Sequence, residues 1–124
     1  MAHKTAVLCD HKTTMAIVQH LLKKLGFSVF MAASGKKGLI LIREKKPQLV
    51  ITDVDNPARN GIGILRGLTS GGSESPLVIA FTFNESPEHH AKVKALGARE
   101  VIVKPFKPAD LAKKVQALME KGTL

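Results

Sequence analysis

Four polar residues each close a short apolar run in this chain of 124 residues. They are Asp10 after AVLC, Asp53 after LVIT, Thr82 after LVIAF, and Lys104 after VIV. Mg²⁺ prefers oxygen ligands such as carboxylates, and phosphoryl transfer requires that cations neutralise the phosphoryl oxygens. A carboxylate can also act as the nucleophile and form an acyl phosphate. Two carboxylates, a hydroxyl and an ammonium group at one place would therefore suit a divalent cation and a phosphoryl group.

A parallel sheet would bring these residues together, because the carboxyl ends of its strands lie at one edge, where ligands bind. Strand-like apolar runs cover residues 5–9, 28–32, 49–52, 76–82 and 100–104. Segments of helical period alternate with them over residues 13–25, 36–46, about 62–69, 87–96 and 108–120. The alternation predicts an α/β domain of (βα)5 type, with right-handed crossovers and a parallel sheet. The continuous apolar character of the middle strands predicts helices on both faces.

Turn and capping residues support these boundaries. Gly26 and Gly97 stand where two of the helices should stop, a position at which glycine is common. The sequence Ser86-Pro87-Glu88 has the marks of a helix start, with a capping hydroxyl, a proline at the first position and an acid in the first turn. We therefore expect a helix to begin at residue 87.

The length fits one domain, and an apolar content of 44% is that of an ordinary globular protein. No apolar run approaches the ~20 residues that a membrane span needs. The N-terminal MAHKTAVLCD reads as a first strand and not as a signal peptide. The single cysteine, Cys9, cannot form an internal disulfide, which fits a reducing cytoplasm.

The net charge of +9 is unevenly distributed, because residues 1–50 hold nine Lys or Arg and two acidic residues. Two interpretations stay open. The lysines can form a solvated surface that complements helix dipoles, or an electropositive docking face for an acidic partner or nucleic acid. The chain has no Tyr or Trp on which bases could stack, which argues against nucleic acid.

The motifs around these residues resemble those of response-regulator receiver domains, the CheY-like family. The resemblance rests on VLCD, on ITDVDNPARNG with its D-x-x-x-P-x-x-x-G spacing, on FTF, and on GAREVIVKPF. It covers essentially the whole chain, so that residues 1–124 would form a single receiver domain. It implies a flavodoxin-like three-layer sandwich with a doubly wound, five-stranded parallel sheet of strand order 2-1-3-4-5.

The resemblance also implies a role for each residue of the site. Asp53 would be the phosphoacceptor, Thr82 the switch hydroxyl, and Lys104 the charge partner. Magnesium would be held by Asp10, Asp53 and the main-chain carbonyl of Asp55. Each of these side chains also has a structural alternative: Asp10 as the cap of the first helix, Asp53 as the cap of a loop, Thr82 as an ordinary strand-end residue, and Lys104 as a solvated loop residue.

The resemblance implies a cytoplasmic signalling module and not an enzyme. The upstream partner would be a histidine kinase or a phosphotransfer protein. A downstream effector protein would bind through residues 87–120, and a homodimer is left open, with no membrane contact. The Lys104–Pro105 peptide bond would be cis.

The sequence departs from the family pattern at several positions. Cys9 stands in place of an acid, so we expect a reduced magnesium affinity; a shifted alignment would make His11 the replaced acid instead. Phe83 follows the switch threonine, where its ring would partly cover the site. Val101 occupies the usual place of a rotating aromatic residue.

These departures leave two main hypotheses. In the first, the chain is a phosphorelay component that is phosphorylated on Asp53. In the second, it is a degenerate receiver that acts as a phosphorylation-independent docking module. A flavin or nucleotide binder on the same fold is a third. His89 and His90 are expected to be exposed on one helix, and Phe27, Phe30 and Phe81 to lie in the core.

Overall fold

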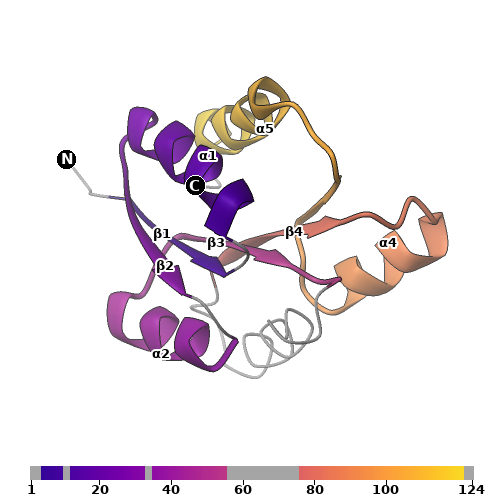
Figure 1. Ribbon diagram of the computed structural model, residues 1–124, viewed down its shortest axis with the longest axis horizontal. Helices are drawn as coiled ribbons and strands as arrows, with labels where there is room; N and C mark the ends of the chain where they lie inside the picture. The colour runs from indigo at the N-terminus through magenta and orange to yellow at the C-terminus, as the bar shows by residue number, and fades with distance from the viewer. Residues whose placement is uncertain (1–3, 10–11, 33–34, 56–75, 122–124) are drawn as a thin grey trace.

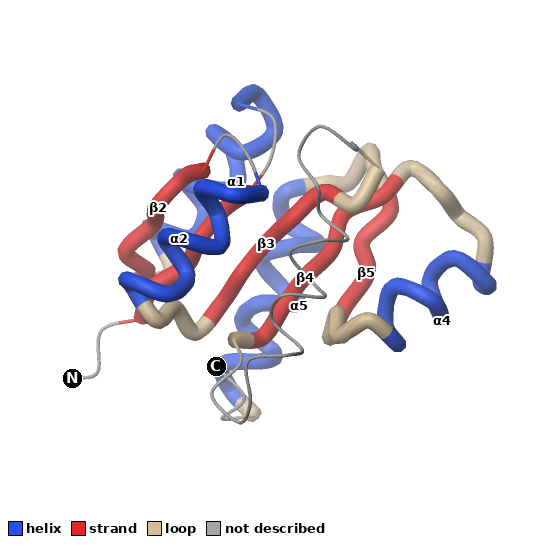
Figure 2. Tube along the Cα trace, turned by 90° about the horizontal axis from the view of Figure 1, so that it is seen from below, coloured by secondary structure: helices blue, strands red, loops and turns tan. Residues whose placement is uncertain are grey.

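The structure is a computed structural model that describes residues 4–9, 12–32, 35–55 and 76–121. These residues form a five-stranded, wholly parallel sheet of order β2-β1-β3-β4-β5 (Figures 1 and 2). The strands are β1 (Lys4–Cys9), β2 (Phe27–Ala32), β3 (Leu49–Asp53), β4 (Leu77–Thr82) and β5 (Glu100–Val103). The predicted strand order is therefore confirmed, and the strand bounds lie within about one residue of those expected.

Helices cover both faces of this sheet, as the continuous apolar strands predicted. The described helices are α1 (Lys12–Lys24), α2 (Gly35–Lys45), α4 (Pro87–Ala95) and α5 (Pro108–Glu120). Helices α1 and α5 lie side by side on one face, and α2 and α4 pack on the other (Figures 1 and 2). The helix expected over residues 62–69 lies outside the described residues.

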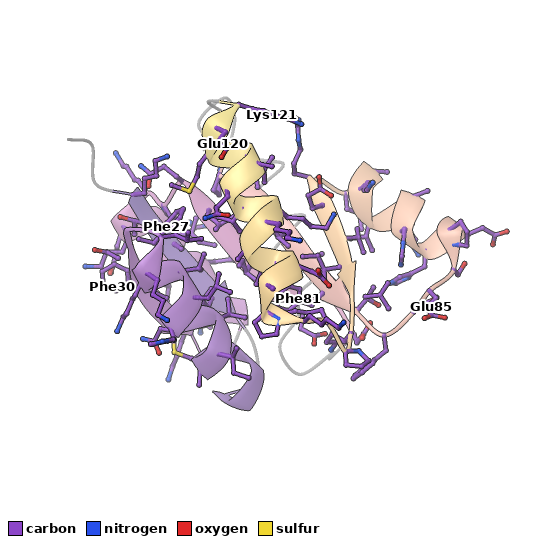
Figure 3. All side chains as sticks on the ribbon, turned by 90° about the horizontal axis from the view of Figure 1, so that it is seen from above. Phe27, Phe30, Phe81, Glu85, Glu120 and Lys121 are labelled. Carbon is purple, nitrogen blue, oxygen red and sulfur yellow. The ribbon has the colours of Figure 1, made fainter. Side chains whose placement is uncertain are left out.

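The face under α1 and α5 carries the larger buried side chains. Val18 and Leu22 of α1 and Leu111 of α5 pack on the sheet there. Phe81 of β4 is fully buried under the N-terminal end of α5 (Figure 3), with its ring centroid 4.7 Å from that of Phe106. Aromatic pairs at this spacing are favourable beyond their burial alone. This contact fixes the segment that leads from β5 into α5.

The opposite face is filled mostly by smaller side chains. Val50 and Ala80 of the sheet meet Ile42 of α2 and Val93 of α4. Phe30 packs at the margin of this cluster and is only partly buried, with the Lys45 amine 4.8 Å from its ring centroid. Phe27 and Phe81 are thus core residues as predicted, whereas Phe30 is a peripheral one.

The predicted helix boundaries follow from local backbone chemistry. Gly26 and Gly97 have φ angles of 97° and 122°, in the region where a side chain would be strained, and they follow α1 and α4. Helix α4 begins at Pro87, and the Ser86 hydroxyl accepts a hydrogen bond from the His89 N–H at 3.4 Å. The cap and the proline therefore act as the sequence indicated.

Candidate functional site

The parallel register brings three of the four predicted side chains to one edge of the sheet. Asp53 is paired with Phe81, the residue before Thr82, in the β3–β4 register. Thr82 is paired with Val103, the residue before Lys104, in the β4–β5 register. The Lys104 N–H also donates to the Thr82 carbonyl at 2.8 Å, which extends the ladder beyond β5. The ends of β3, β4 and β5 therefore present a carboxylate, a hydroxyl and an amine together.

Asp53 and Lys104 form an ion pair at this edge. The Lys104 Nζ donates to Asp53 Oδ2, and the residues are well shielded, with Asp53 4% exposed and the Lys104 side chain 12% exposed. Asp53 Oδ1 accepts a hydrogen bond from the Asp55 N–H at 2.7 Å. A carboxylate this deeply buried requires a charged partner and hydrogen bonds, and Asp53 has both. The Lys104–Pro105 peptide bond is cis, as the resemblance implied.

The side chain of Asp55 is a second carboxylate in the same place. Its Oδ1 accepts from the Thr82 hydroxyl at 2.5 Å, and its Oδ2 accepts from the Phe83 N–H at 2.6 Å. The Lys104 Nζ lies 3.5 Å from Asp55 Oδ2. Partial burial acts to raise the pKa of Asp55, but the hydrogen bonds from Thr82 and Phe83 and the charge of Lys104 outweigh it and lower the pKa.

Sequence reasoning used only the main-chain carbonyl of Asp55 and missed this side chain. The available signal was its position two residues after Asp53, at the same edge of the sheet. That spacing lets the Asp55 N–H bond back to Asp53 in a tight turn. The turn brings the Asp55 carboxylate to Thr82 and Phe83 at the end of the next strand.

The Thr82 hydroxyl connects the site to α4. It accepts from the Asn84 N–H at 3.1 Å, and His89 Nε2 of α4 lies 3.3 Å away. His89 was expected to be exposed but is half-buried against this hydroxyl. It was missed because a hydrophobic pattern does not show which polar helix residue turns toward a strand end. The ring of His90 contacts the Asn84 carbonyl instead, at 2.6 Å.

The ring of Phe83 borders the site without closing it. Its centroid lies 4.2 Å from the Lys104 Nζ, a distance typical of a cation–π contact. The residue is nevertheless 65% exposed. The ring thus contacts Lys104, and the expectation that it partly covers the site stays a prediction.

Part of the predicted metal site lies outside the described residues. Asp10, His11 and residues 56–75 are not among the residues that the structure describes. Strand β1 ends at Cys9, which pairs with Thr52, the residue before Asp53. Among the side chains that the structure describes, no group of three or more His, Cys, Asp or Glu is placed to hold a metal ion. The magnesium ligand set therefore stays a prediction.

The donor chemistry of the described residues fits a hard divalent cation. The carboxylates of Asp53 and Asp55 lie close together, because both are within ion-pair distance of the Lys104 amine. Carboxylate oxygens are the ligands that Mg²⁺ prefers.

The fold and the site define a class of protein: a doubly wound α/β domain with two carboxylates, a lysine and a hydroxyl at the carboxyl edge of its sheet. The sequence profile described as "Response regulator receiver domain" matches residues 6–116. The chain therefore belongs to the response-regulator receiver domain family. Members of this family act in two-component signalling and are not classical enzymes. They interact with kinases and effector domains, and they generally bind Mg²⁺ in an acidic pocket.

Individual relatives agree with this assignment. The probable transcriptional regulator ycf27 of Porphyra purpurea is 27% identical over 119 residues, which cover 96% of this chain and 48% of that protein. The chain thus spans about half the length of that relative. The high-resolution structure of the chemotaxis response regulator CheY4 of Vibrio cholerae is similar, with a TM-score of 0.82 and 27% identity, covering 95% of this chain and 99% of that one.

A further solved structure shows the fold alone. The signal receiver domain of a putative LuxO repressor protein from Vibrio parahaemolyticus has a TM-score of 0.84 and 22% identity, over 97% of this chain and 92% of that one. In the part of this chain that the structure describes, no helix combines the length and the apolar character required to cross a membrane.

Proposed function

We propose that this receiver domain accepts a phosphoryl group on Asp53 from the phosphohistidine of a histidine kinase or a phosphotransfer protein. The observation that carries the proposal is the buried Asp53 carboxylate, which pairs with Lys104 beside the Thr82 hydroxyl. We take residues 1–124 as one receiver unit, since the two hydrophobic clusters pack on the two faces of a single sheet.

The transfer would proceed by attack of one Asp53 oxygen on phosphorus. The new O–P bond forms as the P–N bond of the phosphohistidine breaks, and its electron pair returns to the imidazole nitrogen. The Lys104 amine, already held at the Asp53 carboxylate, would then neutralise phosphoryl oxygens, and the Thr82 hydroxyl would donate to another. In this proposal Lys104 and Thr82 would together stabilise the acyl phosphate.

Magnesium would be held by Asp10, by Asp53 and by the main-chain carbonyl of Asp55, and when bound it would neutralise phosphoryl oxygens. Cys9 supplies no carboxylate at the position before Asp10, so we expect a weaker affinity than two adjacent acids would give.

The proposed output is a change in a docking face over residues 87–120. Thr82 contacts His89 of α4, so a shift of the Thr82 hydroxyl toward a phosphoryl group would alter the contact that holds this helix. The same face has a groove of about 530 Å³ between β5 and α5, bordered by Val101, Phe106 and Lys113 among others. The apolar floor and the lysines suit an effector with an apolar, acidic contact segment.

Two observations favour the alternative of a phosphorylation-independent docking module. The Thr82 hydroxyl and the Phe83 N–H already have an acceptor in Asp55. Val101, half-buried on β5, also cannot rotate as an aromatic switch would. Under this alternative the docking face keeps one state whether or not a phosphoryl donor is present.

Acetyl phosphate with Mg²⁺ distinguishes these functions. We expect an acyl phosphate on the wild-type chain, detected by intact mass and removed by hydroxylamine. Asp53→Asn should abolish it, because the neutral amide cannot attack phosphorus. Asp110→Asn is the matched control, since Asp110 is an exposed acid in the first turn of α5 and should leave the modification unchanged. Absence of any Asp53-dependent modification at millimolar Mg²⁺ would instead support the docking module.

A further inference from the structure

Donors from two adjacent strand ends converge on the carboxylate of Asp55. The Thr82 hydroxyl donates to Oδ1, and the Phe83 N–H donates to Oδ2, at 2.5 and 2.6 Å. The Lys104 amine lies 3.5 Å from Oδ2 while it also pairs with Asp53. A hydroxyl, a main-chain N–H and an ammonium group aimed at one anion form a set of the kind that stabilises phosphoryl oxygens. In this structure the anion that these three groups contact is the Asp55 carboxylate.

The turn after β3 places this carboxylate next to the proposed phosphoacceptor. The Asp55 N–H donates to Asp53 Oδ1, and both carboxylates reach the same lysine amine. A phosphoryl group on Asp53 would extend from the Asp53 carboxylate toward Lys104 and Thr82. Its oxygens would need hydrogen bonds from groups that Asp55 now engages, and its negative charge would repel the carboxylate.

We propose that the Asp55 carboxylate is a resident anion that competes with the phosphoryl group for the donors of Thr82, Phe83 and Lys104. This inference rests on the proposed function of Asp53. It makes Asp55 a positioning residue of the site: its side chain must leave these donors before a phosphoryl group can use them. The unmodified chain then has its switch threonine already hydrogen-bonded to an anion.

The competition has a measurable consequence for the binding of a phosphoryl analogue. Beryllofluoride with Mg²⁺ can be titrated against the wild-type chain and Asp55→Asn, with amide NMR as the readout. We expect Asp55→Asn to lower the Kd by about tenfold or more, which corresponds to the loss of one charge-assisted competitor. The amide NH₂ of the introduced asparagine cannot accept a hydrogen bond from the Phe83 N–H. At least this donor is therefore free to bind the analogue.

Glu85→Gln is the matched control for charge. Glu85 is exposed in the loop between β4 and α4 and projects away from the sheet (Figure 3). This variant removes the same charge from the chain near the site without touching the donors. We expect its Kd to stay within about twofold of the wild-type value, because an exposed charge is largely screened. An equal gain in Glu85→Gln and Asp55→Asn would overturn the proposal.

A double-mutant cycle with Thr82→Val separates shared hydrogen bonding from simple repulsion. If Asp55 competes for the hydroxyl, the gain from Asp55→Asn should shrink in the Thr82→Val background, because contacting residues are not additive. If the effects of the two substitutions on the binding free energy are fully additive, Asp55 acts only through its charge, and the proposed competition for the hydroxyl is wrong. The amide spectrum of each variant reports whether it folds, and Asp55→Ser replaces Asp55→Asn if the latter does not.

The outcomes distinguish this inference from the proposed function. If beryllofluoride binding depends on Asp53 and has equal affinity in the wild type and Asp55→Asn, the proposed role of Asp53 as phosphoacceptor is supported. The proposed role of Asp55 as a competing anion is then wrong. Binding seen only in Asp55→Asn supports both and explains a weak wild-type response. Binding in neither chain rejects both.

Discussion

Helices α4 and α5 lie on opposite faces of the sheet and differ in how many of their side chains are buried against it. Helix α5 buries Leu111, Val115 and Leu118 against one face, whereas Val93 is the buried residue of α4 on the other. Stabilisation grows with the apolar area removed from water, so α5 is a firm support and α4 is the helix that costs less free energy to move. The difference indicates which element would respond to a change at the site.

The polar site joins these two regions. Lys104 leads into the segment fixed by the contact between Phe81 and Phe106, and Thr82 leads through Asn84 and His89 to α4. A group that engages Lys104 and Thr82 together therefore connects a fixed support to a weakly packed helix. Variants in each region can test this comparison.

The largest effect is expected in the firm region. Leu111→Ala leaves a cavity at a fully buried position between α5 and the sheet and should lower the free energy of unfolding by about 2–5 kcal/mol. Urea unfolding followed by circular dichroism measures this change. A loss below about 1 kcal/mol would mean that α5 is not the firm support described above.

A smaller but substantial loss is expected where the site meets this support. Lys104→Met leaves the buried Asp53 carboxylate without its cation and should cost about 1–3 kcal/mol. This is less than the ~3–5 kcal/mol for breaking a fully buried pair, because Asp53 keeps its hydrogen bond from the Asp55 N–H and can take up a proton. Lys107→Met is the control, since Lys107 is exposed at the start of α5 and should change stability little.

A second substitution identifies the cause of that loss. Adding Asp53→Asn to Lys104→Met should recover part of the stability, because a neutral amide does not require the cation. The free energies of unfolding of the single and double variants form a double-mutant cycle. Strict additivity would show that the amine and the carboxylate do not act as a pair.

Val93→Ala tests the weakly packed helix. Removing two methyl groups from its buried residue should cost about 1.5 kcal/mol at about 0.8 kcal/mol for each carbon. Hydrogen exchange should quicken in α4 and stay unchanged in α5. If the loss equals that of Leu111→Ala, or exchange quickens equally in both helices, the two faces do not differ as argued.

Much of the fold could be predicted from the sequence because the pattern that specifies it is local. Apolar runs such as LVIT and LVIAF remain strands in the structure, and Gly97 ends its helix through a backbone angle that favours glycine. The strand order 2-1-3-4-5 was then implied by the resemblance to receiver domains. Phe30 was misplaced because composition does not show where the margin of the sheet lies.

The site was predictable only where a strand end determines it. Asp53, Thr82 and Lys104 meet because each lies at or directly after the end of a strand. The Asp55 side chain and His89 were missed because their contacts depend on the direction of a turn and of a helix face relative to a neighbouring strand. Such contacts join residues of different elements, and no periodicity along the chain encodes them.

The smallest effect on stability, and the sharpest on signalling, is expected at His89. Its contact with the Thr82 hydroxyl is long, at 3.3 Å, so His89→Ala should cost only about 0.5 kcal/mol. The same change removes the side chain through which Thr82 reaches α4. Amide shifts in α4 on adding beryllofluoride and Mg²⁺ should therefore shrink, while those around Asp53 persist.

His90→Ala provides the comparison, because its ring contacts the Asn84 carbonyl and not Thr82. Both variants remove an imidazole from the same turn of the same helix, so a loss of helix propensity affects them alike. Attenuation in His89→Ala alone would place the coupling in the contact with Thr82. Equal attenuation in both would assign it to the packing of the whole turn, and then the weak anchoring of α4 by Val93 would suffice to explain its response.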